Sequence, residues 1–110
     1  MHSSLTLPEP IAAYFVADTK GPDQVVQCFT PKAVVYDNDH IFTGPDAIRA
    51  WKKAADAKYT CTTEPFSLEL IEGVHAVKAR VAGNFKGSPL DMNFLFRLER
   101  GLIAKMEVTV

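Results

Sequence analysis

The residues with the clearest chemical potential lie in the segment Y-D-N-D-H, which covers positions 36–40. Asp37, Asp39 and His40 place two carboxylates and an imidazole within four positions, directly after the apolar run at 33–35. An imidazole titrates near neutral pH and a carboxylate can orient it, so an Asp–His pair suits general acid–base catalysis. Asp and Asn are also favoured in tight turns, because their side chains bond the local backbone. For Asp37 and His40 the catalytic and the structural interpretation both stay open.

Strand geometry predicts which of these side chains lie together. If the flanking strands pair through a two-residue turn at 38–39, Asp37 and His40 are directly opposed, with Cβ atoms roughly 4.5–5.5 Å apart. The apolar run at 33–35 argues that the face carrying Asp37 looks toward the interior of the protein. Strand alternation sends Asp39 elsewhere and no fourth ligand is apparent, so no metal site is expected here.

Proline and glycine residues divide the chain into a helical first half and a strand-rich second half. Apolar residues at helical spacing predict helices beginning near Pro10, Pro22 and Pro45, the second of which ends at Pro31. A short strand hairpin around 33–42 lies between the second and third helices. In the second half, side chains alternate with period two. The strands predicted there cover residues 60–72, 74–85, 90–99 and 102–110.

This order of elements predicts one α+β domain over residues 1–110, with three helices on one face of a strongly curved, mostly antiparallel sheet. In the third helix, Ile48, Trp51 and Ala55 form the stripe expected to face inward, while Lys52 and Asp56 are expected to face water.

Composition and charge narrow the class of protein. The 110 residues are 47% hydrophobic and 23% charged, with a formal net charge of −1 and scattered Lys and Arg. Binding to nucleic acid or to an anionic membrane needs a basic face, and neither partner is expected. The first ten residues lack the features of a signal peptide, and the longest early apolar run is too short to span a bilayer. Cys28 and Cys61 form no C-x-x-C motif, so two reduced thiols are expected, with a single disulfide as the alternative. These features predict a cytoplasmic protein.

Three segments of the chain, by their order and spacing, resemble the nuclear transport factor 2-like superfamily, in its SnoaL-like polyketide cyclase and ketosteroid isomerase-like branch. They are C-F-T-P-K-A-V-V-Y-D (28–37), F-T-G-P-D-A-I-R-A-W (42–51) and the hairpin meander ending in L-I-A-K-M-E-V. The resemblance covers nearly the whole chain. It implies a cone-shaped, cystatin-like roll with an apolar pocket inside, and a homodimer formed through the outer face of the sheet. Since this fold carries many activities, it does not fix the function.

The resemblance also suggests roles for single residues. In ketosteroid isomerases the aspartate that closes this strand is the general base, and Asp37 matches that position. Their oxyanion hole combines a tyrosine with a protonated aspartate. Tyr14 is the candidate for the tyrosine, although a gapless alignment places Ala13 there. The position of the second acid is Phe94, which cannot donate a hydrogen bond, and this departure argues against steroid isomerisation by that mechanism.

Two functional interpretations follow. The first is a small, cofactor-independent enzyme with cyclase, isomerase or dehydratase-type chemistry on a hydrophobic, carbonyl-bearing small molecule. Asp37 would be its base, His40 the partner of that base and Tyr14 a hydrogen-bond donor. The alternative is a non-catalytic module that holds an apolar ligand or a partner chain. The side chains expected to line or fill the cone are Trp51, Tyr59, His75, Met92, Phe94, Phe96 and Met106.

Overall fold

Three helices and six strands make up residues 5–110, which are the residues that the computed structural model describes. The helices are α1 (Glu9–Ala17), α2 (Pro22–Val26) and α3 (Pro45–Lys58). The strands are β1 (Phe29–Asp37), β2 (His40–Thr43), β3 (Cys61–Ile71), β4 (Val74–Gly83), β5 (Leu90–Glu99) and β6 (Leu102–Thr109). The prediction that no signal peptide is present falls partly on residues 1–4, which lie outside this range. Within it, no helix is long and apolar enough to cross a membrane.

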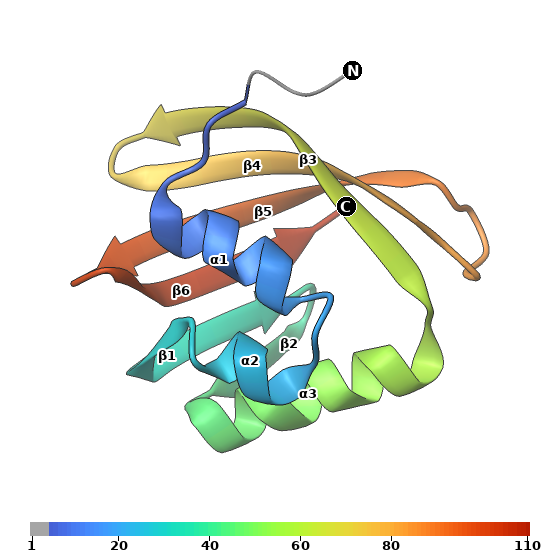
Figure 1. Ribbon diagram of the computed structural model, residues 1–110, viewed down its shortest axis with the longest axis horizontal. Coiled ribbons are helices and arrows are strands. Elements are labelled where there is room, and N and C mark those ends of the chain that lie inside the picture. Colours follow the sequence, from blue (N-terminus) through green and yellow to red (C-terminus); the bar gives the residue numbers. More distant parts are fainter. Residues whose placement is uncertain (1–4) are drawn as a thin grey trace.

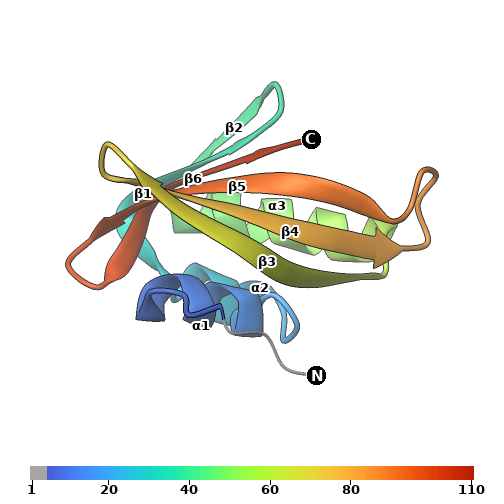
Figure 2. The same cartoon turned by 90° about the horizontal axis from the view of Figure 1, so that it is seen from above.

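The strands form one curved sheet in the order β2-β1-β6-β5-β4-β3 (Figure 1). Neighbouring strands are antiparallel, except that β1 and β6 run parallel. A parallel pair needs a long connection, and here α3 and the β3–β5 meander supply it. The three helices lie on the concave side of the sheet (Figures 1 and 2). The predicted α+β roll, with a curved and mostly antiparallel sheet around three helices, is therefore confirmed.

Helix α1 packs across the concave face through residues at helical spacing. Ile11, Tyr14 and Ala17 are buried, and they meet strand residues such as Phe96 and Met106, whose side chains are fully buried. The rings of Tyr14 and Phe96 meet edge to face, with centroids 5.8 Å apart. A helix of nine residues has little stability of its own, so this packing holds it in place.

The start of α3 follows from three consecutive residues. Gly44 has a φ of 85°, which glycine adopts without strain, and Pro45 occupies the first helical position. Asp46 places a carboxylate in the first turn, where it complements the helix dipole. Ile48 is fully buried, so the predicted inward stripe of this helix is confirmed at its first residue.

Two prolines lie at irregular strand pairings. The register of β3 against β4 shifts between Pro65 and Ser67, because proline has no N–H to donate to the ladder. The prediction that the second helix continues to Pro31 is wrong. Helix α2 ends at Val26 and β1 already begins at Phe29, where the backbone N–H of Ile103 donates to the carbonyl of Cys28 (2.8 Å). Tertiary pairing with β6 overrides the local helical pattern, and a register shift between Phe29 and Val34 leaves room for the proline.

Candidate functional site

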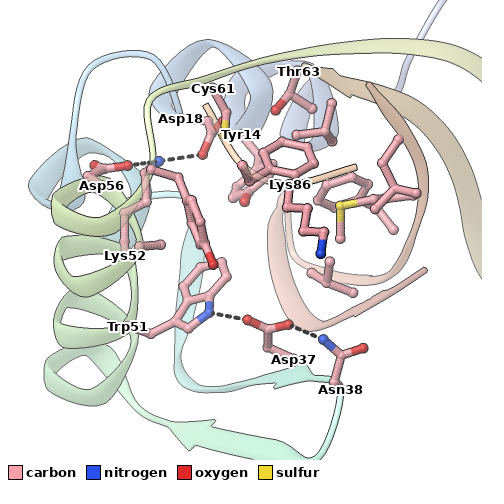
Figure 3. Close-up of a pocket in the computed structure, with 18 residues that line it drawn as sticks. Tyr14, Asp18, Asp37, Asn38, Trp51, Lys52, Asp56, Cys61, Thr63 and Lys86 are labelled. Carbon is pink, nitrogen blue, oxygen red and sulfur yellow. Dashed lines mark hydrogen bonds and ion pairs between the residues drawn. The ribbon is translucent and has the colours of Figure 1, made fainter. Parts of the chain in front are cut away.

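A cavity of about 490 Å³ opens on the concave side, between α1, α3 and the ends of several strands (Figure 3). Aromatic and long apolar side chains form most of its wall, among them Tyr14, Trp51, Tyr59, Phe85, Met92 and Phe94. This size and character are typical of small-molecule sites, which combine an apolar wall with a few fixed polar groups. The fixed polar groups of this cavity come chiefly from the end of β1, from α3 and from the end of α1.

Asp37 presents its carboxylate to the cavity from the end of β1. The indole Nε1–H of Trp51 donates to Asp37 Oδ2 (2.9 Å), and the amide Nδ2–H of Asn38 donates to Oδ1 (3.2 Å). The first bond crosses from α3 to β1, so it fixes the carboxylate relative to a helix as well as to its own strand (Figure 3). An ionised carboxylate accepts up to about four hydrogen bonds, so Asp37 keeps free lone pairs for a ligand.

His40 pairs with Asp37 in the register but does not reach the cavity. The predicted pairing of Asp37 with His40 is confirmed, and Asn38 begins the turn with a φ of 54°, which asparagine tolerates. The side chain of His40 is exposed, stacks on Phe42 (6.4 Å between ring centroids) and makes no hydrogen bond or ion pair with Asp37. The predicted dyad inside the cavity is therefore wrong. The physical reason is that β2 is the edge strand of the sheet. His40 is the first residue of β2 and lies in solvent at the rim of the cavity.

Tyr14 reaches the cavity from α1, as the resemblance suggested. Its neighbour Ala13, the gapless alternative, is exposed, because only every third or fourth residue of α1 faces the sheet. Tyr14 is 2% exposed and lines the cavity, and its hydroxyl has no hydrogen-bond partner among residues 5–110. Burial, followed by the negative charge of Asp18, raises the pKa of Tyr14 well above its ordinary value. At neutral pH it is therefore a protonated hydrogen-bond donor.

Lys52 is a functional candidate that the sequence interpretation missed. It was expected to face water, but it is 6% exposed and lines the cavity. Its Nζ lies 2.6 Å from Asp18 Oδ1 and 2.7 Å from Asp56 Oδ1 (Figure 3). Burial alone lowers the pKa of a lysine, but the hydrogen bonds and charges of both aspartates outweigh it, so the pKa of Lys52 is raised. The available signal was the spacing of Ile48, Lys52 and Asp56, four residues apart on one helix face.

The remaining predicted lining residues divide by their position along the sheet. Trp51, Tyr59, Met92 and Phe94 line the cavity as expected. The cavity does not reach three others, His75, Phe96 and Met106, so their assignment to a substrate site is wrong. Phe96 and Met106 instead fill the core, which was the other expectation for them. The cavity lies where the early part of β5 diverges from the helices, whereas α1 covers the sheet farther along and fills that space with core. The Nδ1 atom of His75 is buried without a hydrogen-bond partner in the described part of the chain.

Two further side chains at the cavity were not expected there. Cys61 lines it as a free thiol, and burial raises the pKa of this thiol, so it is neutral at pH 7. Lys86, in the loop between β4 and β5, is exposed, and its ammonium group points into the cavity (Figure 3). Within residues 5–110, no group of three or more His, Cys, Asp or Glu side chains is arranged to hold a metal ion.

Several solved structures share this architecture. A candidate polyketide cyclase from Sinorhizobium meliloti is 33% identical to the chain, with a TM-score of 0.88, and the match covers 94% of this chain and 95% of that one. A hypothetical protein of ketosteroid isomerase-like fold from Catenulispora acidiphila, solved in complex with trimethylamine, is 22% identical over 96% and 87% of the two chains, with a TM-score of 0.83.

A SnoaL-like polyketide cyclase candidate from Jannaschia has a TM-score of 0.75 at 15% identity, over 98% of this chain and 90% of that one. At such low identity, the Catenulispora and Jannaschia proteins show the fold alone. No protein-family model matches the sequence, and no curated protein matches it either.

Proposed function

The chain belongs to the nuclear transport factor 2-like superfamily, in its SnoaL-like polyketide cyclase and ketosteroid isomerase-like branch, and from this premise we propose that it is an acid–base enzyme. Its substrate is a hydrophobic, carbonyl-bearing small molecule. The observation that carries the proposal is Asp37, a carboxylate that the indole of Trp51 orients on the wall of an aromatic-lined cavity. The fold alone does not carry it, since this architecture also serves proteins without catalytic activity.

Asp37 acts as the general base in this proposal. It removes a proton from the carbon next to the carbonyl group of the substrate, so the C–H bond breaks and its electron pair enters an enolate. The proton passes to a carboxylate oxygen, which has a free lone pair beside the hydrogen bond from Trp51 or Asn38. Fixing the carboxylate on both oxygens holds the base in one orientation, which favours proton transfer within the cavity.

Tyr14 stabilises the enolate oxygen. Its phenol is neutral at pH 7 and its hydroxyl is not engaged within the described chain, so it can donate to the oxygen on which charge develops. One such preorganised donor typically lowers the barrier by about 2.7–4 kcal/mol. Phe94 stands where ketosteroid isomerases place their second acid, so the second donor must come from elsewhere. We assign this role to the ammonium group of Lys86, which points into the cavity (Figure 3).

The enolate can continue in three ways. The protonated Asp37 returns its proton to a different carbon in an isomerisation, or gives it to a departing hydroxyl group in a dehydration. In a cyclisation, the enolate carbon attacks a second carbonyl group of the same molecule and forms a ring, and the alkoxide that results takes the proton from Asp37. All three need the same first proton transfer, and no further cofactor takes part in it.

The first proton transfer is tested by deuterium exchange. Hydrophobic ketones are incubated with the protein in deuterated water, and incorporation next to the carbonyl group is followed by NMR. We expect Asp37→Asn to slow the protein-dependent exchange by about 10²-fold or more. Asp39→Asn, an exposed change in the same turn, is the matched control and should leave the exchange unchanged. The proposed activity would be overturned if no ketone underwent protein-dependent exchange. It would also be overturned if Asp37→Asn retained the full exchange rate.

A second candidate function is a non-catalytic binding module of the same fold. The observation that favours it is Phe94, an apolar side chain at the position of the second acid, in a wall that is mainly aromatic and aliphatic. A binding module would take up apolar ligands without deuterium exchange, and Asp37→Asn would leave their affinity unchanged. Quenching of Trp51 fluorescence, the only tryptophan signal of the chain, measures that affinity.

We also propose that the chain forms a homodimer through the convex face of the sheet. Residues there alternate with the buried ones of the same strands and are mixed in character. Tyr36 lies under the ammonium group of Lys105 (4.7 Å from its ring centroid), and Leu95 is partly buried between Ala76 and Glu107. Such a moderately polar patch suits a symmetric interface, in which each copy presents the same surface to the other.

A further inference from the structure

Apart from Lys86, the charged side chains of the cavity lie at two separate places (Figure 3). One is Asp37 at the end of β1, the proposed base. The other consists of Asp18, Lys52 and Asp56, where the end of α1 meets α3, and we call it the lysine cluster. Aromatic side chains form the wall between the two places. The proposed proton transfer uses only the first of them.

The lysine cluster has unused hydrogen-bonding capacity of both kinds. A lysine ammonium group carries three N–H donors, and Asp18 and Asp56 engage two of those of Lys52. The third donor has no partner within residues 5–110. Each aspartate uses its Oδ1 atom toward Lys52, and no hydrogen bond occupies either Oδ2 atom in the same part of the chain. The cluster can therefore donate to a ligand and accept from it.

The charge of the cluster selects among ligand groups. One lysine and two aspartates give a formal charge of −1. A ligand carboxylate would face the net negative charge of the cluster. A ligand ammonium group has no acceptor, so it would leave the third N–H of Lys52 unused. A neutral hydroxyl group both donates and accepts, so it can pair with the cluster without facing a like charge.

Tyr14 adds a polar group to the same cavity. It lines the cavity and its hydroxyl has no protein partner among the described residues, so the hydroxyl is available to a ligand. Tyr14 lines the same cavity as Asp18, Asp37 and Asp56, and the negative charges of these aspartates add to burial in raising its pKa. A ligand lying along this wall contacts both ends.

Stability alone does not account for the lysine cluster. The ion pair between Lys52 and Asp18 does join α3 to α1. However, removing charges from water is costly, and replacing a buried ion pair with apolar residues is often neutral or stabilising. Ala55 and the aromatic wall show that apolar groups are accommodated beside it.

We propose that the lysine cluster is a specificity site that binds a hydroxyl group of the substrate, at the end opposite the carbonyl group on which Asp37 acts. The substrate class is then a hydroxylated, largely apolar ketone with its two polar groups at opposite ends. This inference rests on the proposed function, because it takes the carbonyl end of the ligand to lie at Asp37.

The experiment uses two ligands that differ in one hydroxyl group. They are a phenyl-substituted cyclohexanone and its para-hydroxyphenyl counterpart, and their affinities for the wild-type protein are measured by calorimetry. We expect the hydroxylated ketone to bind about tenfold more tightly or better, as a hydrogen bond to charged groups provides. Lys52→Met, which keeps the aliphatic stem, should abolish this preference. Lys53→Met, an exposed change at the next position of α3, is the matched control and should retain it.

The preference is measured as the ratio of the two ligand affinities. If Lys52 had a purely structural role, its replacement would weaken the binding of both ligands equally and leave this ratio unchanged. Asp56→Ala is the second variant, because it leaves the pair between Lys52 and Asp18 and changes a half-exposed side chain, so the fold is retained. It should reduce the preference several-fold. Equal affinities in the wild-type protein, or a preference that survives in Lys52→Met or in Asp56→Ala, would overturn the inference and leave the proposed function standing. If neither ketone binds, both are overturned.

Discussion

Replacing Tyr14 with Phe separates catalysis from stability, because its hydroxyl is the only part of the side chain that changes. The ring makes edge-to-face contacts with Phe15, Phe29 and Phe96, at centroid distances of 5.2, 6.0 and 5.8 Å, and Phe at this position keeps them. The hydroxyl has no hydrogen-bond partner within residues 5–110. Its removal therefore breaks no bond inside the described chain.

The magnitudes of the two effects follow from this difference. Removing a hydroxyl that faces the cavity and has no protein partner changes the free energy of unfolding by less than about 1 kcal/mol. Removing the donor to the enolate oxygen slows deuterium exchange by about 10²–10³-fold. Tyr14→Phe is thus expected to be an inactive protein of normal stability.

Urea unfolding measures the stability and NMR-detected deuterium exchange measures the activity. Tyr36→Phe is the control, since Tyr36 lies on the convex face and its hydroxyl is outside the cavity. A loss of stability well above 1 kcal/mol in Tyr14→Phe would mean that the hydroxyl has a protein partner. An unchanged exchange rate would remove Tyr14 from the mechanism. Either result would refute the role of the Tyr14 hydroxyl as a free donor to the enolate oxygen.

Three further predictions concern the rim, the ionised groups and the outer face. His40→Ala should leave deuterium exchange unchanged, because His40 does not contact Asp37; a loss comparable to that of Asp37→Asn would restore the dyad. Both Lys52 and Tyr14 have raised pKa values in the fold, so their contributions to stability are complete below their unfolded pKa values of about 10 and are lost as the pH rises further. The difference in unfolding free energy between the wild-type protein and Lys52→Met should therefore be constant up to about pH 10 and then shrink; a difference that shrinks from neutrality onward would contradict this sign. Sedimentation should show a dimer at micromolar concentration and a monomer for Leu95→Glu, whereas a monomeric wild-type protein would refute the convex interface.

The catalytic proposal and the specificity site depend on different side chains, so they are separable by experiment. Asp37 and Tyr14 decide whether exchange occurs, and Lys52 decides which ketone is preferred. Asp37→Asn should therefore lose exchange while keeping the preference for the hydroxylated ligand, and Lys52→Met should show the reverse pattern. This crossed outcome is difficult to obtain from general damage to the fold.

Local sequence determined much of this protein. Residue spacing and the positions of Gly and Pro predicted the order of helices and strands, because these preferences act within a few residues. The pairing of Asp37 with His40 was predictable for the same reason, since a two-residue turn fixes the register of a hairpin. The resemblance then indicated Asp37 and Tyr14 as members of one site.

Tertiary structure decided what each of these groups contacts. The partner of Asp37 is Trp51, 14 residues away on α3, because that helix packs beside the end of β1 while His40 remains at the sheet edge. Lys52 is buried because α3 meets the end of α1 at Asp18, a contact between segments that share no local pattern. Phe94 and Phe96 lie on the same face of β5, but only Phe94 lines the cavity. The reason is that Phe94 lies where the sheet diverges from the helices. Periodicity gives the face of an element, whereas the distance between two faces depends on the packing of the whole chain.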